Sequence, residues 1–217
     1  MAASRGIPLD DHSRDPAATS PVLRAQVTEL ALSVEHLLRA NPDPRAAAFL
    51  DDWPDLQSTG TLSGDDGLPV VRWLAGWPER IDCRIIAHEV ARLSHRLQWA
   101  HTYKKEDFGP AFLENYGWTE LIGLRGPIRH EALACGFLLL GPATEYPMHR
   151  HVAEEIYIPI SGTAAWRAGE GDWSLKRPGE VIFHASLVPH AMRTDAEPLL
   201  ALYLWHKGDL REKSQIG

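Results

Sequence analysis

Cysteine is scarce in this chain of 217 residues, and the two that occur, Cys83 and Cys135, are far apart. No CxxC pair is present, so the sequence offers neither a disulfide framework nor a thiolate zinc site. We expect both thiols to be reduced residues of a buried core.

Positive charge is also in short supply. The chain has 22 Lys and Arg against 29 Asp and Glu, a formal net charge of −7. No stretch is rich in Lys or Arg, so the chain lacks a basic patch that could bind a nucleic-acid phosphate backbone. We therefore expect no nucleic-acid partner.

Long apolar runs are missing as well. The richest, ALACGFLLLG at 132–141, has the length of a strand, whereas a membrane-spanning helix needs about 18 to 20 apolar residues. The first twenty residues lack the apolar centre of a secretory signal. These absences predict a soluble, cytoplasmic protein with no membrane partner.

Helical signals dominate residues 21–110. Ser20-Pro21 reads as an N-cap followed by proline at the first helical position. Apolar residues then recur at helical spacing, at Leu23, Val27, Leu30, Val34, Leu37 and Leu38. The prolines at 42 and 44 end this helix. We expect a short helical patch at 45–50, a loop at 57–67 and a second long helix at 79–97.

Strand signals take over from about residue 130. Short or alternating apolar segments are separated by Gly or Pro, among them ALACGFLLL, EIYIPIS, EVIFHA and LLALYLW. This pattern predicts the antiparallel strands of a sandwich or barrel. The organisation we expect is a disordered or extended start at 1–20, a helical segment at 21–110 and a β-barrel at 111–217.

A cluster of metal-binding residue types lies in this strand-rich half. His149 and His151 are two residues apart, so on a strand they face the same side. Glu155 follows four residues later, and His190 precedes a later strand. Three imidazoles and one carboxylate suit a divalent metal, and we predict that His149, His151, Glu155 and His190 hold one such ion.

The spacing resembles that of the cupins. His149-x-His151-x3-Glu155-x6-Gly162 matches the first cupin motif, and Gly179 with His190 has the spacing of the second. The resemblance implies a double-stranded β-helix, or jelly-roll, barrel. Four motif positions differ, where the expected Gly, Pro, Gly and Asn are replaced by Ala143, Ala185, Leu187 and Thr194.

A narrower resemblance covers roughly residues 98–210. The run FLENYGWTELIGLRGP at 112–127, with Tyr146, Tyr157 and Trp205 at their spacings from the histidines, is similar to the bacterial cupin dimethylsulfoniopropionate (DMSP) lyases. The resemblance implies a metal-dependent carbon–sulfur lyase that cleaves this small zwitterion to acrylate and dimethyl sulfide by β-elimination.

Such an elimination needs a base, and the resemblance proposes Tyr146 and Tyr157. A nearby dication favours the phenolate and lowers the pKa of tyrosine. Tyr157 is in phase with Glu155 and His151 along the strand, whereas Tyr146 is out of phase unless a kink at Pro147 redirects it. Either tyrosine could instead fill the barrel or hold a ligand by its hydroxyl.

The sulfonium group of the substrate should lie against aromatic faces. The chain has eight Trp, and Trp205 is the first candidate, followed by Trp118 and Trp166. Each of them could equally be a core residue. His184 is in phase with His190, and we expect it to support the metal ligands or to contact substrate.

Two other functions fit the same residues. A cupin site with three His and one Glu could belong to a non-haem iron dioxygenase, or the chain could bind a small molecule without turning it over. The ligands suit Zn, Fe, Mn, Co or Ni equally. The sequence also allows a homodimer, and the helical segment could cap the barrel or pair protomers.

Overall fold

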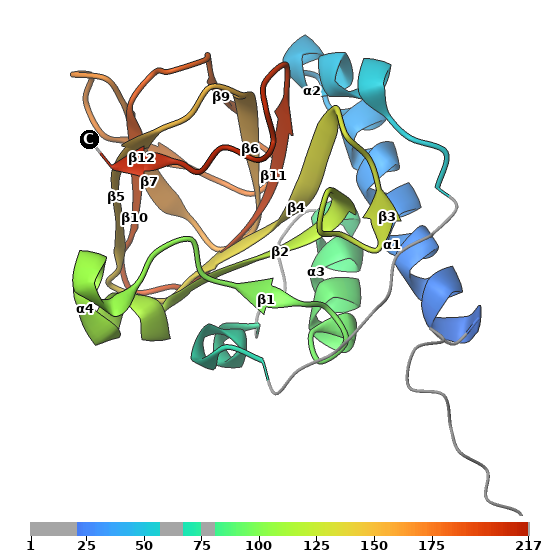
Figure 1. Cartoon of the computed structure of the whole chain (residues 1–217), viewed down its shortest axis with the longest axis horizontal. Coiled ribbons are helices and arrows are strands. Elements are labelled where there is room, and N and C mark those ends of the chain that lie inside the picture. The colour runs from blue at the N-terminus through green and yellow to red at the C-terminus, as the bar shows by residue number, and fades with distance from the viewer. Residues whose placement is uncertain (1–20, 57–66, 75–80, 217) are drawn as a thin grey trace, which may run out of the picture.

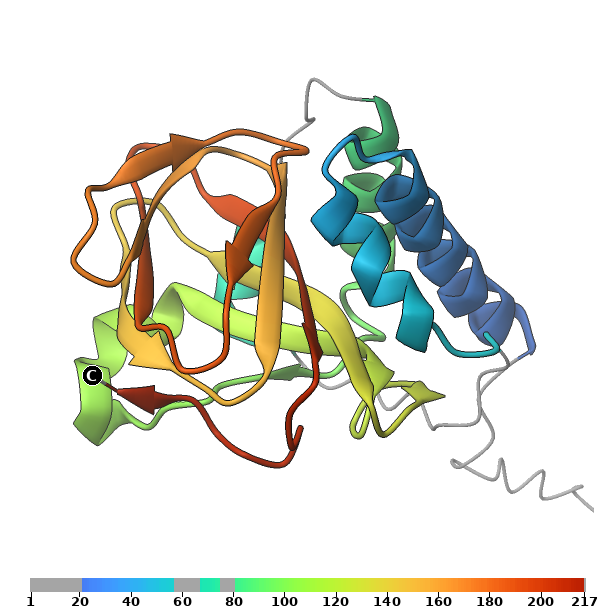
Figure 2. The ribbon, with the colours of Figure 1, turned by 90° about the horizontal axis from the view of Figure 1, so that it is seen from above.

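The computed structural model describes residues 21–56, 67–74 and 81–216. Two β-sheets face each other as a barrel, and helices pack against the outside of one sheet (Figure 1). Seen from above, the helices form a layer beside the barrel (Figure 2). The segment expected to be extended, 1–20, and all but the last residue of the expected loop at 57–67 fall outside the described residues.

The first predicted helix is confirmed as α1 (Pro21–Ala40), and its apolar stripe is buried at Val27, Leu30, Val34, Leu37 and Leu38. The short patch forms α2 (Pro44–Ala48), in which the Asp43 side chain accepts a hydrogen bond from the backbone N–H of Arg45. Two 3-10 helical turns follow at Phe49–Asp52 and Pro69–Trp73. None of the described helices is long and apolar enough to cross a membrane.

The second long helix, α3 (Ile81–Leu93), ends four residues before the predicted position. Beyond Leu93 the chain tightens into a turn, in which the backbone N–H groups of Arg96 and Leu97 both donate to the Leu93 carbonyl. The Trp99 indole donates to the Ser94 carbonyl at 3.1 Å, which holds this turn against the sheet. Leu97 keeps the buried position that the helical stripe predicted, although it is not helical.

The larger sheet has seven strands in the order β1-β2-β4-β11-β6-β9, with β3 pairing in parallel with β2. These strands are β1 (Trp99–Ala100), β2 (Tyr116–Gly123), β3 (Ile128–Arg129), β4 (Leu133–Leu140), β6 (Glu154–Ser161), β9 (Ile182–His184) and β11 (Leu199–His206). The helix α4 (Lys105–Glu114) connects β1 to β2.

The smaller sheet has five strands in the order β12-β5-β10-β7-β8. They are β5 (Glu145–Arg150), β7 (Ala164–Ala168), β8 (Ser174–Lys176), β10 (His190–Thr194) and β12 (Gln215–Ile216). All pairings in this sheet are antiparallel. The two facing sheets confirm the predicted cupin barrel.

Both faces of the larger sheet are buried, which explains the continuous apolar run of β4. Phe137 and Leu139 face a core shared with α1 and α3, whereas Leu138 and Leu140 face the barrel interior. Neighbouring residues of a strand point to opposite faces, so a sheet covered on both sides needs apolar residues throughout. Cys83 and Cys135 form no disulfide in the described part of the chain and are buried in the helix-side core, as expected.

Two turns have the left-handed backbone conformation that favours glycine, although alanine and leucine replace the glycines of the cupin motifs. Ala143, between β4 and β5, has φ 50°, and Leu187, before β10, has φ 62°. A left-handed φ costs an L-residue about 1–2 kcal/mol. Hydrogen bonds retain the geometry, because the Ala143 and Leu187 N–H groups donate to the Asp195 and His151 carbonyls at 2.7 and 2.8 Å. The substitutions noted in the sequence therefore leave the turns intact.

Candidate metal centre and pocket

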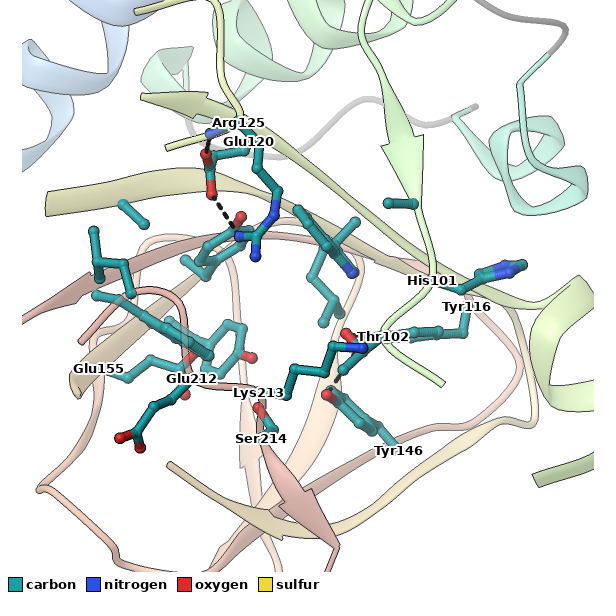
Figure 3. Close-up of a pocket in the computed structure, with 18 residues that line it drawn as sticks. His101, Thr102, Tyr116, Glu120, Arg125, Tyr146, Glu155, Glu212, Lys213 and Ser214 are labelled. Atoms are coloured by element: carbon teal, nitrogen blue, oxygen red, sulfur yellow. Dashed lines mark hydrogen bonds and ion pairs between the residues drawn. The ribbon is translucent and has the colours of Figure 1, made fainter. Parts of the chain in front are cut away.

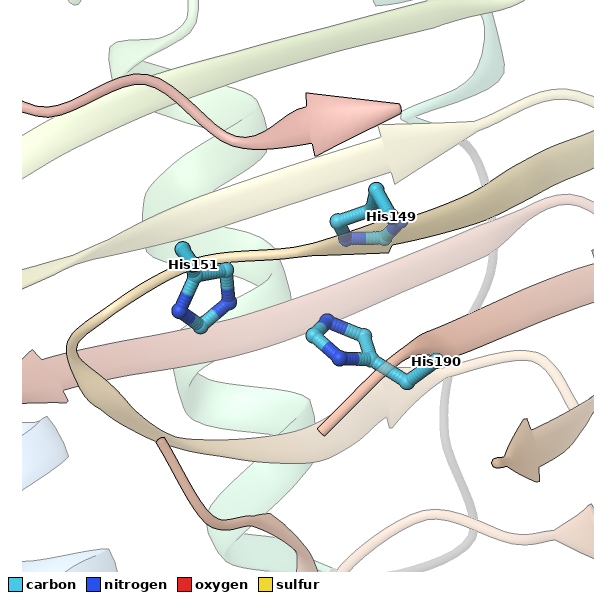
Figure 4. A group of neighbouring side chains, drawn as sticks. All are labelled: His149, His151 and His190. Atoms are coloured by element: carbon cyan, nitrogen blue, oxygen red, sulfur yellow. The ribbon is translucent and has the colours of Figure 1, made fainter. Parts of the chain in front are cut away.

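Three histidine rings meet inside the barrel (Figure 4). His149 and His190 are directly opposite each other in the β5–β10 ladder, and His151 follows the end of β5. One ring nitrogen from each lies within 4.8 Å of the others. All three residues are buried, at 1 %, 4 % and 0 % exposure for His149, His151 and His190.

The backbone fixes how each ring is oriented. The three Nδ1 atoms lie 2.8–2.9 Å from carbonyl oxygens, those of Pro147, Ala153 and Val188. A carbonyl only accepts, so each Nδ1 carries a proton, and Nε2 is the ring atom left to bind a metal. Metal-ligating histidines are commonly held in this way.

Glu155 supplies a carboxylate to the same cluster. It is fully buried, and its Oε2 lies 3.0 Å from His151 Nε2 and 3.1 Å from His190 Nε2. The Trp205 indole donates to the other oxygen at 2.5 Å. Burial alone would raise the pKa of Glu155, but the His151 and His190 imidazoles outweigh it and hold the pKa well below its usual range. The carboxylate is therefore ionised, as a metal ligand must be.

His184 lies beside this cluster, with its ring stacked on His190 at a centroid distance of 3.9 Å. Burial, reinforced by His190, lowers the pKa of both His149 and His184 to about 3. Both rings are therefore neutral near pH 7, and neutral imidazole is the form that binds metals. The donor set of imidazoles and one carboxylate has the chemistry of a site for a divalent metal.

A pocket of about 290 Å³ opens beside Glu155 (Figure 3). Its wall includes residues that the sequence singled out, namely Trp118, Tyr146, Glu155, Tyr157 and Trp205. Trp166 is buried at 2 % exposure and lies 6.1 Å from the Tyr157 ring, but it is not among the residues that line the pocket. The size of the pocket suits a small molecule.

Tyr146 reaches the pocket through an irregularity in β5. In the β5–β10 ladder, His190 pairs with His149 and Met192 pairs with Tyr146. Two residues along β10 therefore correspond to three along β5, so β5 carries one extra residue near Pro147. A bulge of this kind redirects the side chains on one side of it. The Tyr146 ring consequently stacks on His149 at a centroid distance of 4.0 Å. Tyr157 reaches the pocket from the regular strand β6, in phase with Glu155 as predicted. The prediction of one strand that also carries His149 and His151 was wrong, because β5 ends at Arg150 and β6 begins at Glu154 in the other sheet.

The surroundings of the two tyrosines differ. The Tyr146 hydroxyl lies 3.1 Å from that of Tyr103 and 3.4 Å from that of Tyr116. Tyr157 lines the pocket together with the Glu155 carboxylate. Burial raises the pKa of both Tyr146 and Tyr157 well above the usual value, and the Glu155 charge adds to the rise at Tyr157. In the pocket as it stands, both are neutral phenols.

The two tryptophans that line the pocket both contact neighbouring side chains. Trp205 stacks on His151 at 4.2 Å and holds Glu155 through its indole nitrogen. The Arg125 guanidinium lies over the Trp118 ring at 5.8 Å from the ring centroid. One face of each ring is thus covered by a neighbour.

Several pocket residues were not found by reading the sequence. Tyr116, Glu120 and Arg125 belong to the FLENYGWTELIGLRGP run, so that stretch was itself a signal. Glu120 accepts hydrogen bonds from the backbone N–H groups of Arg125 and Gly126, and burial raises its pKa. Tyr103 carried no such signal, because only its contact with Tyr146 brings it to the site.

The end of the described chain forms another part of the wall. Leu210, Glu212, Lys213 and Ser214 line the pocket, and β12 then pairs with β5, placing Ile216 opposite His149. No motif marks this segment in the sequence. Pairing with the edge of the smaller sheet is what positions it.

A barrel of two facing sheets with a buried His/Glu cluster inside defines a metal-binding cupin. The family model for dimethylsulfoniopropionate lyase matches residues 62–201 of this chain. The chain belongs to that family.

Two curated relatives and two solved structures illustrate the similarity. The chain is 37% identical over 122 residues to the putative dimethylsulfoniopropionate lyase DddL of Cereibacter sphaeroides, and 37% identical over 113 residues to the dimethylsulfoniopropionate lyase DddQ of Ruegeria pomeroyi. These matches cover 55% and 52% of this chain but only 50% and 56% of the relatives, so the chain matches about half the length of each.

The structural likeness extends further along the chain. A structure from a study of the DMSP lyases RdDddP and RnDddQII superposes with a TM-score of 0.80 at 27% identity, covering 89% of this chain and 98% of the other. DddQ from Ruegeria pomeroyi DSS-3 gives a TM-score of 0.76 at 26% identity, with 88% and 95% covered. Coverage this high includes helices as well as the barrel.

Proposed function

We propose that this protein is a metal-dependent carbon–sulfur lyase that cleaves DMSP to acrylate and dimethyl sulfide. The arrangement of the pocket is the main support for this proposal. A single small pocket brings two buried tyrosine hydroxyls beside a carboxylate that belongs to a cluster of inward-facing imidazoles. Membership of the DMSP lyase family supports the choice of substrate.

In this proposal His149, His151, Glu155 and His190 hold one divalent metal. When bound, the metal would neutralise the substrate carboxylate and stabilise the negative charge that develops next to it, which is the Lewis-acid role of such ions. The inward-facing Nε2 atoms and the ionised Glu155 support this set of ligands. The set suits zinc, iron, manganese, cobalt and nickel.

Tyr157 is the base in this proposal. Its side chain lines the same pocket as Glu155. A divalent metal, when bound, would favour the phenolate of Tyr157, whose own proton would pass to solvent. The phenolate oxygen then takes the proton from the carbon next to the substrate carboxylate. The electron pair of the broken C–H bond forms the double bond of acrylate, and the C–S bond breaks to release neutral dimethyl sulfide. Positioned bases of this kind accelerate proton transfer by about 10²–10⁴-fold.

Tyr146 has a positioning role in the proposal. Its hydroxyl is held between those of Tyr103 and Tyr116, while its ring covers His149. This arrangement fixes one wall of the pocket against the metal ligands. Trp118 and Trp205 contribute aromatic surface for the sulfonium group, a contact worth about 0.5–2 kcal/mol for each well-placed ring.

The test is dimethyl sulfide release, measured by headspace gas chromatography, from purified protein of known metal content mixed with DMSP. We expect release together with acrylate, and a loss of about 10²-fold or more in kcat for Tyr157→Phe. Tyr203→Phe is a matched control, because it removes a hydroxyl from the same pocket.

Other results of the same experiment would refute the lyase or favour another function. A folded, metal-loaded sample that releases no dimethyl sulfide would refute the lyase. Oxygen consumption by an iron-loaded sample would favour the dioxygenase, and tight binding without product would favour a binding protein. A larger loss in Tyr146→Phe than in Tyr157→Phe would reassign the base.

A further inference from the structure

Glu120 is a buried carboxylate in the pocket wall that the proposed reaction does not use. Only 8 % of the residue is exposed, and it lines the pocket together with Glu155. Its Oε1 accepts hydrogen bonds from the backbone N–H groups of Arg125 and Gly126, the second at 2.9 Å. Its Oε2 faces the Arg125 guanidinium, with Nη1 at 3.9 Å. The loop after β2 thus fixes the carboxylate through one oxygen and leaves the other for a cation.

The Arg125 guanidinium already occupies a cation site made by two other side chains. It lies over the Trp118 ring, 5.8 Å from the ring centroid, and beside the Glu120 carboxylate (Figure 3). An aromatic face and a carboxylate both attract an organic cation. The Arg125 side chain is 51 % exposed, and an ion pair with a half-exposed arginine is weak. The guanidinium can therefore move out to solvent while the backbone N–H of Arg125 still holds Glu120.

Strand pairing places this cation site across the pocket from the proposed base. Glu120 of β2 pairs with Gly136 of β4. Gly136 pairs in turn with Tyr203 of β11, and Tyr203 with Tyr157 of β6. Paired residues project to the same face of a sheet, and neighbouring strands are about 4.8 Å apart. The row therefore has Glu120 at one end and Tyr157 at the other, with a residue that lacks a side chain between them.

We propose that Glu120 and Trp118 form the subsite for the sulfonium group, and that Arg125 occupies this subsite in the free protein and leaves it when substrate binds. The inference rests on the proposed function for the identity of the substrate. The carboxylate of DMSP binds at the β6 end of the pocket, where Glu155 and Tyr157 lie, and its sulfonium group binds at the β2 end. One cation replaces another beside Glu120, so the subsite selects a compact onium group over a neutral group of the same shape.

Two acids of the same shape test this selection, 3-(trimethylammonio)propanoate and 4,4-dimethylpentanoate, which differ in the charge of the quaternary centre. Isothermal titration calorimetry on metal-loaded protein gives both Kd values, and the ratio of the neutral to the cationic Kd measures the preference for a cation. Glu120→Gln keeps an acceptor for the loop N–H groups, and Arg125→Gln removes the resident cation. Glu212→Gln is the matched control, because it removes the charge of an exposed acid in the same pocket wall. Circular dichroism verifies folding.

We expect the ratio to fall at least about tenfold in Glu120→Gln, since a unit charge is lost beside a partly buried cation. It should rise in Arg125→Gln, because the resident cation no longer competes, and change by about twofold or less in Glu212→Gln. Opposite shifts in the first two variants distinguish a subsite from a general loss of structure.

An unchanged ratio in Glu120→Gln, or folded, metal-loaded protein that binds neither acid, would overturn the subsite. A ratio that does not rise in Arg125→Gln would overturn the exchange of cations, and this variant tests the proposal even where Glu120→Gln does not fold. The lyase is judged separately. Dimethyl sulfide release by the unaltered protein with no effect of Glu120→Gln on the ratio would overturn the subsite alone, whereas the expected ratios without any release would overturn the lyase alone.

Discussion

Trp205→Phe isolates one hydrogen bond to Glu155, the carboxylate of the proposed metal site. The substitution keeps an aromatic ring against His151, now stacked at 4.2 Å, and removes the indole donor that lies 2.5 Å from Glu155 Oε1. Hydrogen bonds to charged groups contribute about 1.5–3 kcal/mol. The substitution leaves a fully buried carboxylate with one donor fewer. The free energy of unfolding of the metal-free protein should therefore fall by about 1.5–3 kcal/mol.

The same loss should weaken metal binding. A donor that orients a ligand typically contributes about 10–100-fold to metal affinity, and we expect Trp205→Phe to raise the metal Kd by that factor. Urea denaturation measures the first effect, and competition with a chelator of known affinity measures the second.

Trp166→Phe provides the matched control. Trp166 is as deeply buried as the cluster, but its indole nitrogen has no hydrogen-bond partner in the part of the chain that the structure describes. The control removes the same atoms from a tryptophan with no donor function, so it should leave the metal Kd nearly unchanged. Equal changes in the two variants would refute the reasoning, because ring volume and not the hydrogen bond would then be responsible.

Three further predictions concern the turns, acid stability and the metal. Ala143→Gly should raise the free energy of unfolding by about 0.5–1 kcal/mol, since relief of about 1–2 kcal/mol of left-handed strain exceeds the entropy cost of glycine. Ala196→Gly, at an exposed alanine without positive φ, should lower it, and thermal denaturation that shifts both variants downward would contradict the argument. The metal-free protein should lose stability as the pH falls from about 6.5 toward 3, because His149 and His184 stay neutral in the folded state, with pKa lowered to about 3, while the unfolded chain takes up protons. The slope is about 1.4 kcal/mol per pH unit for each histidine, and a flat series of urea denaturation curves over this range would argue against it. Chelation should end dimethyl sulfide release and one added divalent metal should restore it, so full release by metal-free protein would exclude a metal-dependent lyase.

Periodicity predicted the elements that bury one stripe or one face. The α1 stripe and the phase of Tyr157 with Glu155 both follow from fixed side-chain periods of about 3.6 and 2 residues. The prediction was less accurate where tertiary contacts override the period. The helix α3 ends at Leu93 because Trp99 binds the following turn, and no local pattern at 94–97 signals that contact.

The candidate site also combines features that local spacing predicts with features that depend on tertiary contacts. His149, His151 and Glu155 are close in the sequence, and β5, the loop after it and the start of β6 bring them together. His190 was predicted from its place before a later strand, but the pairing of β10 with β5 is what places it opposite His149. Tyr103 lies outside every motif, and only the packing of the loop before α4 brings its hydroxyl to Tyr146.

By itself, the sequence determined the antiparallel strands, the proximity of His149, His151 and Glu155, and one of the two pocket tyrosines, because each depends on short-range spacing along the chain. Tertiary structure alone decided that a bulge near Pro147 turns Tyr146 toward His149, that His184 faces Glu155, and that residues 210–214 close one wall of the pocket. These features depend on strand register and on pairing between distant segments. Such pairing reflects the packing of the whole barrel and not the preference of any one segment.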